Sequence, residues 1–419
     1  MVEKYLALNQ SELPERLSSI SAITDKVGSN FSNWDVKEVG DGNLNLVFIV
    51  IGDKGKIIIK QALPHMRLVG EGWPLTLERS FFEYNALIRQ EKSDPGIIPE
   101  VYYFNKTQGL IAMEFLEYHK ILRVKLINGE KVEGLSNSLG KHCARLAFRG
   151  SELSMDSSEK KADSALFYRN VELMGITQNF VFTDPYYKAE LNFNTDGLAP
   201  IIKILRQDTK LKTQAHKMLM KFSSHGETMC HGDLHSGSIM CTHNDTKIID
   251  PEFAIYGPMG FDLGMLIANY LMSFFSQPAH RLNSIETSAF QSWLLKIIED
   301  TVEKFSTEFR SLWNKERKGI LYSKSLFEDQ GQSSKYALDS VMSDIWKNSL
   351  SFCGIEMLRR CLSLAHNADF EKIEDTIMRA KLEARNLMMG RELLLNPNSI
   401  KGVKSLINMA KEFNRKDFL

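Results

Sequence analysis

The 419-residue sequence has few cysteines and no excess of either charge. Its 52 lysines and arginines balance 52 aspartates and glutamates, so no overall field favours nucleic acid or an anionic membrane surface as a partner. The five cysteines are odd in number and irregularly spaced, which is typical of reduced thiols and not of a disulfide framework. Together these features predict a cytoplasmic protein with no nucleic-acid or membrane partner.

Long uninterrupted apolar runs are also missing. The first residues, MVEKYLALNQSELPERL, carry Glu3 and no apolar core segment, so they do not predict a signal peptide. The longest apolar run, FDLGMLIANYLMSFF, contains Asp262 and Asn269 and predicts a buried helix rather than a membrane span. Hydrophobic residues still make up 43% of the chain, enough for a substantial core.

The first third of the chain predicts strands. The stretch VKEVGDGNLNLVFIVIGDKGKIIIKQAL (36–63) predicts three antiparallel strands joined by glycine turns. A hairpin is expected at 99–116, with its turn near 106–109, and a helix at about 77–92.

Beyond about residue 117, helical patterns dominate. They lie at 138–149, 165–180, 198–223, 262–276, 286–314, 335–365 and 370–392. The polar stretch GSELSMDSSEKKAD (150–163) predicts an exposed connection between helices. The expected fold class is therefore α+β. Residues 1–116 are expected to form a small antiparallel β-rich lobe with one main helix, and residues 117–419 a larger, mainly helical lobe.

Five features in chain order carry polar chemistry. The glycine turn at 40–43 lets backbone N–H groups approach a phosphate, although an ordinary hairpin turn has the same composition. Lys60 closes the apolar strand KIIIK, and Glu83 on the following helix is able to reach back and pair with it. The fourth feature is HGDLHSGSIM (231–240), and the fifth is Asp250-Pro251-Glu252, directly after the strand-like KIID.

The stretch HGDLHSGSIM has three chemical interpretations. Zinc binding is disfavoured because His231 and His235 are separated by glycine and polar residues, which do not predict the helix of an HExxH site. A serine hydrolase is disfavoured because the order Ser-Gly-Ser does not form a GxSxG nucleophile elbow. Phosphoryl transfer accounts for all five features, since it needs phosphate-binding amides, a lysine held by a glutamate, a carboxylate beside the accepting hydroxyl, and oxygen ligands for Mg²⁺.

The spacing within this stretch matches the catalytic loop of kinases. That loop is H-x-D with a Mg²⁺ ligand five residues after the aspartate. Here His231, Asp233 and Ser238 occupy those places, with serine where asparagine is usual, and Asp250 occupies the place of the aspartate in the DFG motif. The order and spacing together indicate a kinase more strongly than any single feature does.

The chain resembles the protein-kinase-like superfamily, in the branch of small-molecule kinases that includes aminoglycoside and choline kinases. Within that branch it resembles the 5-methylthioribose kinases. The resemblance lies in GDGNLNLVFIV, IIIKQALP, HGDLHSGSIM, DPEFAIYGPMGFDLG and GIEMLRR, which are spread from about 36 to 365. It implies a bilobal protein-kinase-like fold, ATP and Mg²⁺ as cofactors, and phosphorylation of the 1-hydroxyl of 5-methylthioribose in methionine salvage.

The resemblance also implies roles for individual residues on the nucleotide side. Lys60, braced by Glu83, is expected to contact the phosphates, and the backbone of Glu114 and Leu116 is placed to bind adenine. Asp250 and Glu252 are expected to hold Mg²⁺. Ser238 either ligates the metal or shapes the loop. The glycine turn expected at the phosphates consists of Gly40, Asp41, Gly42 and Asn43.

On the acceptor side, Asp233 is expected to bind the substrate hydroxyl and orient it. Adjacent arginines on a helix point about 100° apart, so Arg359 and Arg360 would ordinarily face solvent, but the resemblance implies that both reach the sugar. Trp73 is either a lid over the ligands or an anchor that packs its loop on the core. Asp262 is expected to cap a helix and brace the catalytic loop.

Two alternatives share the fold. One is a kinase of another sugar, an amino alcohol or an aminoglycoside, against which the arginine pair argues because cationic acceptors call for acidic or aromatic sites. The other is a nucleotide-binding protein without catalysis, against which the intact Lys60, Asp233 and Asp250 argue. A homodimer is expected from the resemblance alone.

Overall fold

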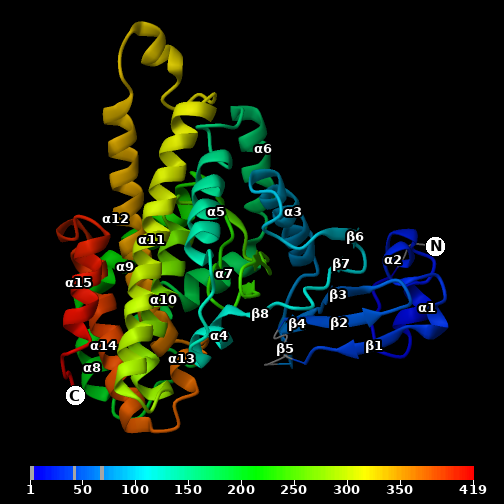
Figure 1. The fold of residues 1–419 in the computed structure, drawn as a ribbon, viewed down its shortest axis with the longest axis horizontal. Coiled ribbons are helices and arrows are strands. Elements are labelled where there is room, and N and C mark those ends of the chain that lie inside the picture. Colours follow the sequence, from blue (N-terminus) through cyan, green and yellow to red (C-terminus); the bar gives the residue numbers. More distant parts are fainter. Residues whose placement is uncertain (1–3, 41–43, 67–69) are drawn as a thin grey trace.

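The computed structural model describes residues 4–40, 44–66 and 70–419. Strands gather on one side of the molecule and long helices on the other (Figure 1). The chain runs once from the strand-rich part to the helical part, so the described residues form the expected α+β, bilobal arrangement. The boundary at 116/117 stays a prediction; it falls between β7 and β8.

The main sheet of the described residues has five antiparallel strands in the order β1-β2-β3-β7-β6. Its strands are β1 (Asp35–Glu38), β2 (Asn45–Ile51), β3 (Lys56–Ala62), β6 (Val101–Asn105) and β7 (Leu110–Glu114). Three short elements precede the sheet: α1 (Leu13–Leu17), α2 (Ser21–Val27) and the turn η1 (Phe31–Asn33). After β3 come the paired strands β4 (His65–Met66) and β5 (Gly70–Pro74), and then the helix α3 (Glu78–Ser93). The predicted meander, helix and hairpin are therefore confirmed.

Alternation along β3 decides what each face of the sheet does. Ile57 and Ile59 pack with α1 and α2 in one small core. Because successive side chains of a strand point to opposite faces, Ile58 and Lys60 lie on the other face, which α3 covers. A lysine at this position is therefore carried into the molecule by the same register that buries the isoleucines.

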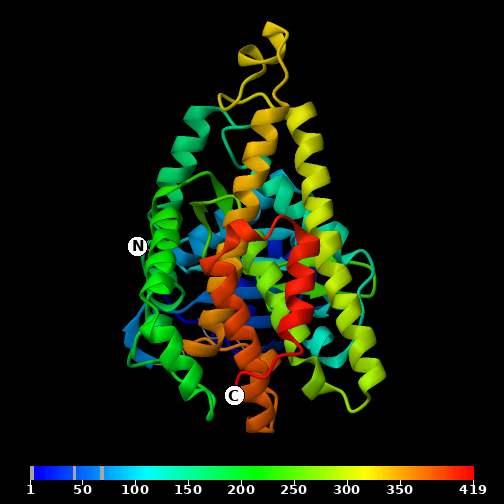
Figure 2. The same ribbon diagram turned by 90° about the vertical axis from the view of Figure 1, so that its left-hand side faces the viewer.

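The helical part is built around α10 (Phe261–His280), whose residues 261–277 are all buried. Around it lie α5, α11, α12 and α14, and Figure 2 shows α14 and α15 on the side away from the sheet. The helices are α4 (Leu122–Asn128), α5 (Leu135–Arg149), α6 (Ser157–Phe167), α7 (Val171–Phe180), α8 (Ala199–Gln207), α9 (Thr209–Ser224), α11 (Ser284–Glu316), α12 (Lys335–Leu362), α13 (Ala368–Glu371), α14 (Thr376–Leu395) and α15 (Val403–Phe413). Short 3₁₀ turns lie at η2 (Asp184–Tyr186), η3 (Lys324–Leu326), η4 (Glu328–Gln330) and η5 (Pro397–Ser399).

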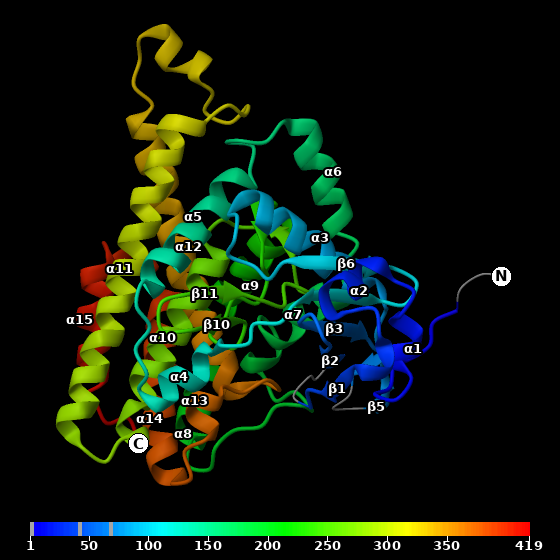
Figure 3. The same cartoon turned by 45° about the vertical axis from the view of Figure 1, so that its right-hand side comes forward.

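The apolar run 261–275 is thus a buried helix, as predicted. Among the described residues, no helix is both long enough and apolar enough to cross a membrane. The segment between α11 and α12, which contains η3 and η4, projects beyond the rest of the molecule (Figure 3).

Some predicted helix boundaries are wrong, and capping explains why. The stretch 150–163, expected as a connection, contains the start of α6, whose N-cap Asp156 accepts a hydrogen bond from the Ser158 N–H at 2.8 Å. The single helix expected at 198–223 is two, because Asp208 ends α8 and caps α9 through the Leu211 N–H at 2.9 Å. Aspartate competes for backbone donors in this way and so favours helix starts.

Short antiparallel pairs position the two polar loops. β9 (Thr228–Cys230) pairs with β12 (Ile255–Gly257), and β10 (Ile239–Cys241) lies between β8 (Lys120–Ile121) and β11 (Thr246–Ile248). The loop 231–238 therefore leaves β9 and enters β10, while the loop 249–254 leaves β11 and enters β12. The pairing brings these two loops side by side.

Candidate active site

The loop after β9 is held by a buried carboxylate. Asp262 accepts hydrogen bonds from the backbone N–H groups of His231 at 2.7 Å and Gly232 at 3.1 Å. Burial raises the pKa of Asp262, while His231 and the two N–H groups act in the opposite direction. Asp262 is therefore the predicted brace, but its predicted capping role is wrong, because Gly260 is the N-cap of α10.

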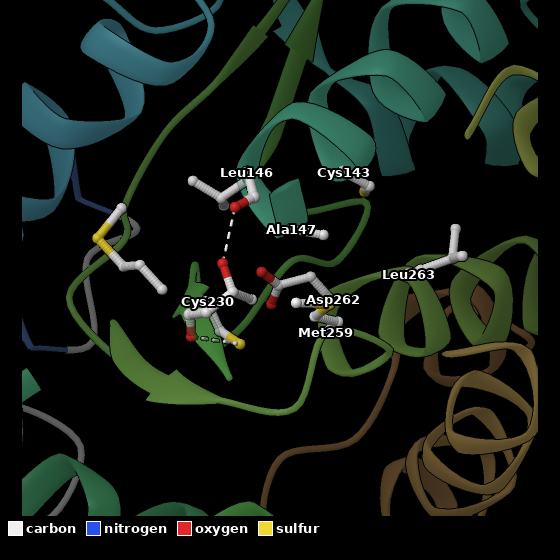
Figure 4. A pocket seen from close by; sticks show the side chains of 9 residues that line it. Cys143, Leu146, Ala147, Cys230, Met259, Asp262 and Leu263 are labelled. Carbon is white, nitrogen blue, oxygen red and sulfur yellow. Dashed lines mark hydrogen bonds between the residues drawn. The ribbon is translucent and has the colours of Figure 1, made fainter. Parts of the chain in front are cut away.

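A small cavity lies directly behind this brace. Figure 4 shows Asp262 beside Cys143, Cys230 and Leu263, with Leu146 accepting a hydrogen bond from the Thr228 hydroxyl at 2.7 Å. Thiols and aliphatic side chains cannot solvate a carboxylate well. The loop amides therefore help to compensate for the Asp262 charge.

His231 connects the two loops. Its Nε2 donates to the Ile249 carbonyl oxygen at 3.0 Å, and its Nδ1 accepts from the Asp233 N–H at 3.3 Å. The ring is fully buried, and burial lowers its pKa. A neutral imidazole with both nitrogens used in this way is a structural link rather than a base.

Asp233 lies where three cationic or polar groups converge. Its carboxylate is 3.1 Å from Arg359 Nη2, 3.3 Å from Arg360 Nη2 and 3.2 Å from His235 Nε2. Burial would raise the pKa of Asp233, but His235 and then the two arginines outweigh it and hold that pKa well below its usual range. Asp233 is therefore an ionised acceptor at neutral pH.

Both arginines of α12 are buried, with 6% and 5% of Arg359 and Arg360 exposed. The solvent-facing alternative is therefore wrong. The two guanidinium groups meet the same oxygen of Asp233, although their Cα atoms are adjacent on a helix.

A second cluster lies around Lys60. Its Nζ is 2.7 Å from Glu83 Oε1 and also contacts Asp250 Oδ1, so the predicted lysine–glutamate pair is present. Burial opposes the charge on Lys60, but the carboxylates of Asp250 and Glu83 raise its pKa above its usual value. The ammonium therefore bridges the sheet, α3 and the loop after β11.

Three carboxylates meet at this point. Oxygen atoms of Glu83, Asp250 and Glu252 all lie within 4.8 Å of one another. Asp250 has a φ of 68°, a conformation uncommon for a non-glycine residue, which turns the chain so that positions 250 and 252 face the same space. Burial, and then the neighbouring Asp250, raise the pKa of Glu252. Hard cations are bound by such oxygen sets.

Sequence reasoning missed Arg79, which is 1% exposed. It lies one turn before Glu83 on α3, and its Nε is 3.6 Å from Glu252 Oε2. Its Nη1 donates to the carbonyl oxygens of Leu63 at 2.6 Å and Thr76 at 3.0 Å, and its Nη2 donates to Asn45 Oδ1 at 3.1 Å. No pattern in the neighbouring sequence predicted that Arg79 is buried, because only the fold places Glu252 beside it.

Arg123, at the start of α4, was also missed. Its Nε donates to Ser236 Oγ at 3.1 Å and its Nη2 to Asn269 Oδ1 at 3.2 Å. Burial, and then the neighbouring Arg360, lower the pKa of Arg123 to about 10. In the sequence, the contact between Arg123 and Asn269 was indicated only by the presence of a polar asparagine within the apolar run.

The remaining predicted residues are placed as follows. Ser238 Oγ donates to the Asp233 carbonyl oxygen at 3.1 Å. Trp73 is half-buried, and its ring centroid is 5.8 Å from that of Phe180 at the end of α7. The Glu114 N–H donates to the Glu100 carbonyl oxygen at 2.8 Å.

Leu116 is buried just past β7, and its carbonyl oxygen accepts from the His119 N–H at 3.2 Å. Gly40 ends the described part of the first glycine turn, and Asp41, Gly42 and Asn43 lie outside the described residues.

A histidine beside this site yields a pH prediction. His366, in the turn after α12, donates through Nε2 to the Phe193 carbonyl oxygen at 3.0 Å and stacks on the Phe193 ring at 3.6 Å. Burial lowers its pKa to about 4. A histidine depressed from about 6.5 stabilises the fold fully above that pH and loses this contribution as the pH falls towards 4.

We therefore expect His366→Gln, which keeps a donor for Phe193 but does not titrate, to show a flatter dependence on pH than the unaltered chain. The difference in unfolding free energy between the two should shrink by up to about 3 kcal/mol as the pH falls through this window. Urea unfolding at pH 7 and pH 5 measures about 2 kcal/mol of this change, the part that falls between these two pH values. A difference independent of pH would contradict the buried neutral state of His366.

With this geometry in view, comparisons with known proteins define the class first. Residues 178–287, which contain both loops, match a model described as the phosphotransferase enzyme family. Among solved structures, a glucosamine kinase covers 91% of this chain and 86% of its own with a TM-score of 0.47 and 13% identity. The region that carries both loops is therefore similar to phosphotransferases.

Relatives that match nearly the full length of the chain identify its family. The chain is 41% identical over 409 residues to a methylthioribose kinase of Escherichia coli O45:K1, covering 97% of this chain and 98% of that one. It is 36% identical over 415 residues to methylthioribose kinase 1 of Oryza sativa subsp. japonica, covering 98% and 96%. The chain belongs to the methylthioribose kinase family, within the protein-kinase-like superfamily, and is a kinase.

Proposed function

We propose that this kinase transfers the γ-phosphoryl group of ATP to the 1-hydroxyl of 5-methylthioribose, giving 5-methylthioribose 1-phosphate for methionine salvage. The observation that carries the proposal is the convergence of Arg359 and Arg360 on the ionised Asp233, in a chain of this family. The hydroxyl oxygen forms a bond to the γ-phosphorus, the bond from that phosphorus to the bridging oxygen breaks, and ADP leaves with the electron pair.

On the acceptor side, Asp233 accepts a hydrogen bond from the 1-hydroxyl, orients it and takes its proton. Arg359 and Arg360 donate to sugar hydroxyls and offset charge on the transferring phosphoryl group. Trp73, resting on Phe180, is the proposed cover over the bound ligands. A site formed by guanidinium groups favours a hydroxyl-rich neutral acceptor over a cationic one.

On the nucleotide side, Lys60 contacts the phosphates and Glu83 holds it in place. The backbone of Glu114 and Leu116 binds adenine, and the glycine turn at 40–43 approaches the phosphates. These roles are consistent with the position of β3 and β7 beside each other in the sheet.

The carboxylates fit a Mg²⁺ ion, because Asp250 and Glu252 present oxygen atoms close to each other and share one buried space. We assign these two residues as ligands. Ser238 is a further candidate, since a hydroxyl that donates to Asp233 keeps its lone pairs. When bound, the ion would offset negative charge on the phosphates.

An ADP-release assay with Mg-ATP tests the proposal, using 5-methylthioribose beside ribose, choline and kanamycin. We expect turnover with 5-methylthioribose and little with the others. Turnover with choline or kanamycin instead would keep the kinase chemistry and contradict the proposed role of the arginine pair. ATP binding without turnover of any acceptor would contradict the proposed reaction.

The family resemblance also supports a homodimer. Analytical ultracentrifugation of the full chain would test it, with a species of about twice the 47.8 kDa monomer expected.

A further inference from the structure

We propose that Glu356 is the positioning residue that makes the acceptor site: its carboxylate aligns Arg359 and Arg360 so that both reach Asp233. The inference rests on the proposed function, in which these two arginines hold the acceptor. Glu356 itself is fully buried, so it acts through the arginines rather than on the ligand.

The geometry of α12 raises a problem that Glu356 solves. Adjacent side chains leave a helix about 100° apart, and nothing in the helix itself brings Arg359 and Arg360 together. Residues three and four positions apart, however, are neighbours on a helix surface. Glu356 precedes Arg359 by three residues and Arg360 by four, so it is the one α12 position that neighbours both through these two spacings.

The hydrogen bonds follow this spacing. Glu356 Oε2 accepts from Arg359 Nε at 2.5 Å, and Oε1 accepts from Arg360 Nε at 2.7 Å and from Arg359 Nη2 at 3.3 Å. With both Nε groups held from behind, the Nη2 group of each arginine extends to Asp233 Oδ1. Guanidinium planarity makes this arrangement rigid, because fixing Nε fixes the direction of the whole group.

The charges of this cluster are matched. Burial of Glu356 disfavours its ionised form, but Arg359 and then Arg360 overcome this and lower its pKa. Asn269 Nδ2 adds a donor at 3.5 Å from Oε1. Glu356 and Asp233 thus balance the two arginines, and a hydroxyl-bearing ligand is able to replace part of the Asp233 contact without leaving a buried charge unpaired.

The position of Glu356 along α12 is also set by close packing. A Cβ atom on Gly354 would lie 2.4 Å from the Gly390 carbonyl oxygen of α14. The two helices approach closely through these glycines, and Glu356 lies on α12 two residues after this contact.

Kinetics of Glu356→Gln test the inference. The amide keeps the size of the side chain but lacks the charge and presents N–H groups to one of the two Nε donors. We expect the KM for 5-methylthioribose to rise about tenfold, with the Kd for nucleotide unchanged. In an Arg359→Ala/Arg360→Ala background, Glu356→Gln should add no further increase, because the groups it positions are gone.

Glu383 offers a matched control. It is 1% exposed and pairs with Arg379, four residues away on α14, at 3.1 Å. Glu383→Gln should lower the Tm without changing the KM for the acceptor. If Glu356→Gln does not fold, Glu356→Asp carries the test, since its shorter carboxylate keeps the charge but cannot reach both Nε groups. Its KM for the acceptor should lie between that of the unaltered chain and that of the Arg359→Ala/Arg360→Ala variant.

The outcomes separate the two proposals. If the arginine variants raise the KM and the Glu356 variants only lower the Tm, as Glu383→Gln does, this inference is overturned and the proposed function stands. If Glu356→Gln has the same effect with and without the arginines, it is likewise overturned. If the arginine variants leave the KM unchanged, the proposed acceptor role fails, and this inference fails with it.

Discussion

Asp233→Asn should lower kcat for phosphorylation of 5-methylthioribose by about 10³-fold. The reason is that the Asp233 carboxylate is ionised: His235 and the two arginines hold its pKa well below the usual range. It therefore accepts a hydrogen bond near neutral pH. An asparagine of the same size turns one oxygen acceptor into an N–H donor. It can neither orient the hydroxyl in the same way nor take its proton.

Nucleotide binding should survive this change, because Lys60, Glu83 and Asp250 form a separate cluster. Initial rates with saturating ATP, together with a nucleotide Kd from calorimetry, would measure both effects. Asp245→Asn is the control. Asp245 also pairs with a histidine, His119 at 2.9 Å, but it lies on the exposed hairpin between β10 and β11.

The Asp245 variant should keep its activity. A fall in kcat of less than tenfold in Asp233→Asn would contradict a role for Asp233 as acceptor of the proton. An equal fall in both variants would indicate a general effect of removing a carboxylate.

Gly232→Ala should unfold or inactivate the chain, with a loss of stability of about 3 kcal/mol or more. Gly232 has a φ of 88°, and a Cβ atom there would lie 2.0 Å from the Phe253 carbonyl oxygen. The added Cβ atom is attached directly to the backbone of residue 232 and the Phe253 oxygen belongs to the backbone, so neither atom can rotate away. Relief requires separating the loop after β9 from the loop after β11, which carry Asp233 and Asp250.

Gly331→Ala separates backbone strain from this collision. Gly331 has a φ of 73° but open space where its Cβ would lie, so only a conformational cost of about 1 kcal/mol is expected. Urea unfolding and initial rates on both variants make the comparison. An equal loss of stability in the two would contradict the close approach of the loops.

Local patterns in the sequence were sufficient where a function depends on residues close together in the chain. Asp233 and Asp250 were located from motifs of a few residues, and Lys60 from its place at the end of an apolar strand. Period-2 alternation then requires Lys60 to point away from the Ile57 and Ile59 face, which is where the structure has it.

The same patterns failed where the reason for a residue lies elsewhere in the fold. Arg79 and Arg123 each look like an ordinary polar residue of a helix. Arg79 lies 173 residues from Glu252, and Arg123 lies 146 residues from Asn269. No local rule pairs residues at such separations.

By itself, the sequence determined the succession of strands and helices, the two loops that carry the aspartates, and the kinase family. Periodicity, glycine turns and motif spacing are properties of neighbouring residues, so they can be read without the fold. The tertiary structure decided that Arg359 and Arg360 are buried and reach one oxygen of Asp233. Helix geometry alone directs adjacent side chains apart, and only a carboxylate held in the core by packing of α12 on α10 and α14 brings them together.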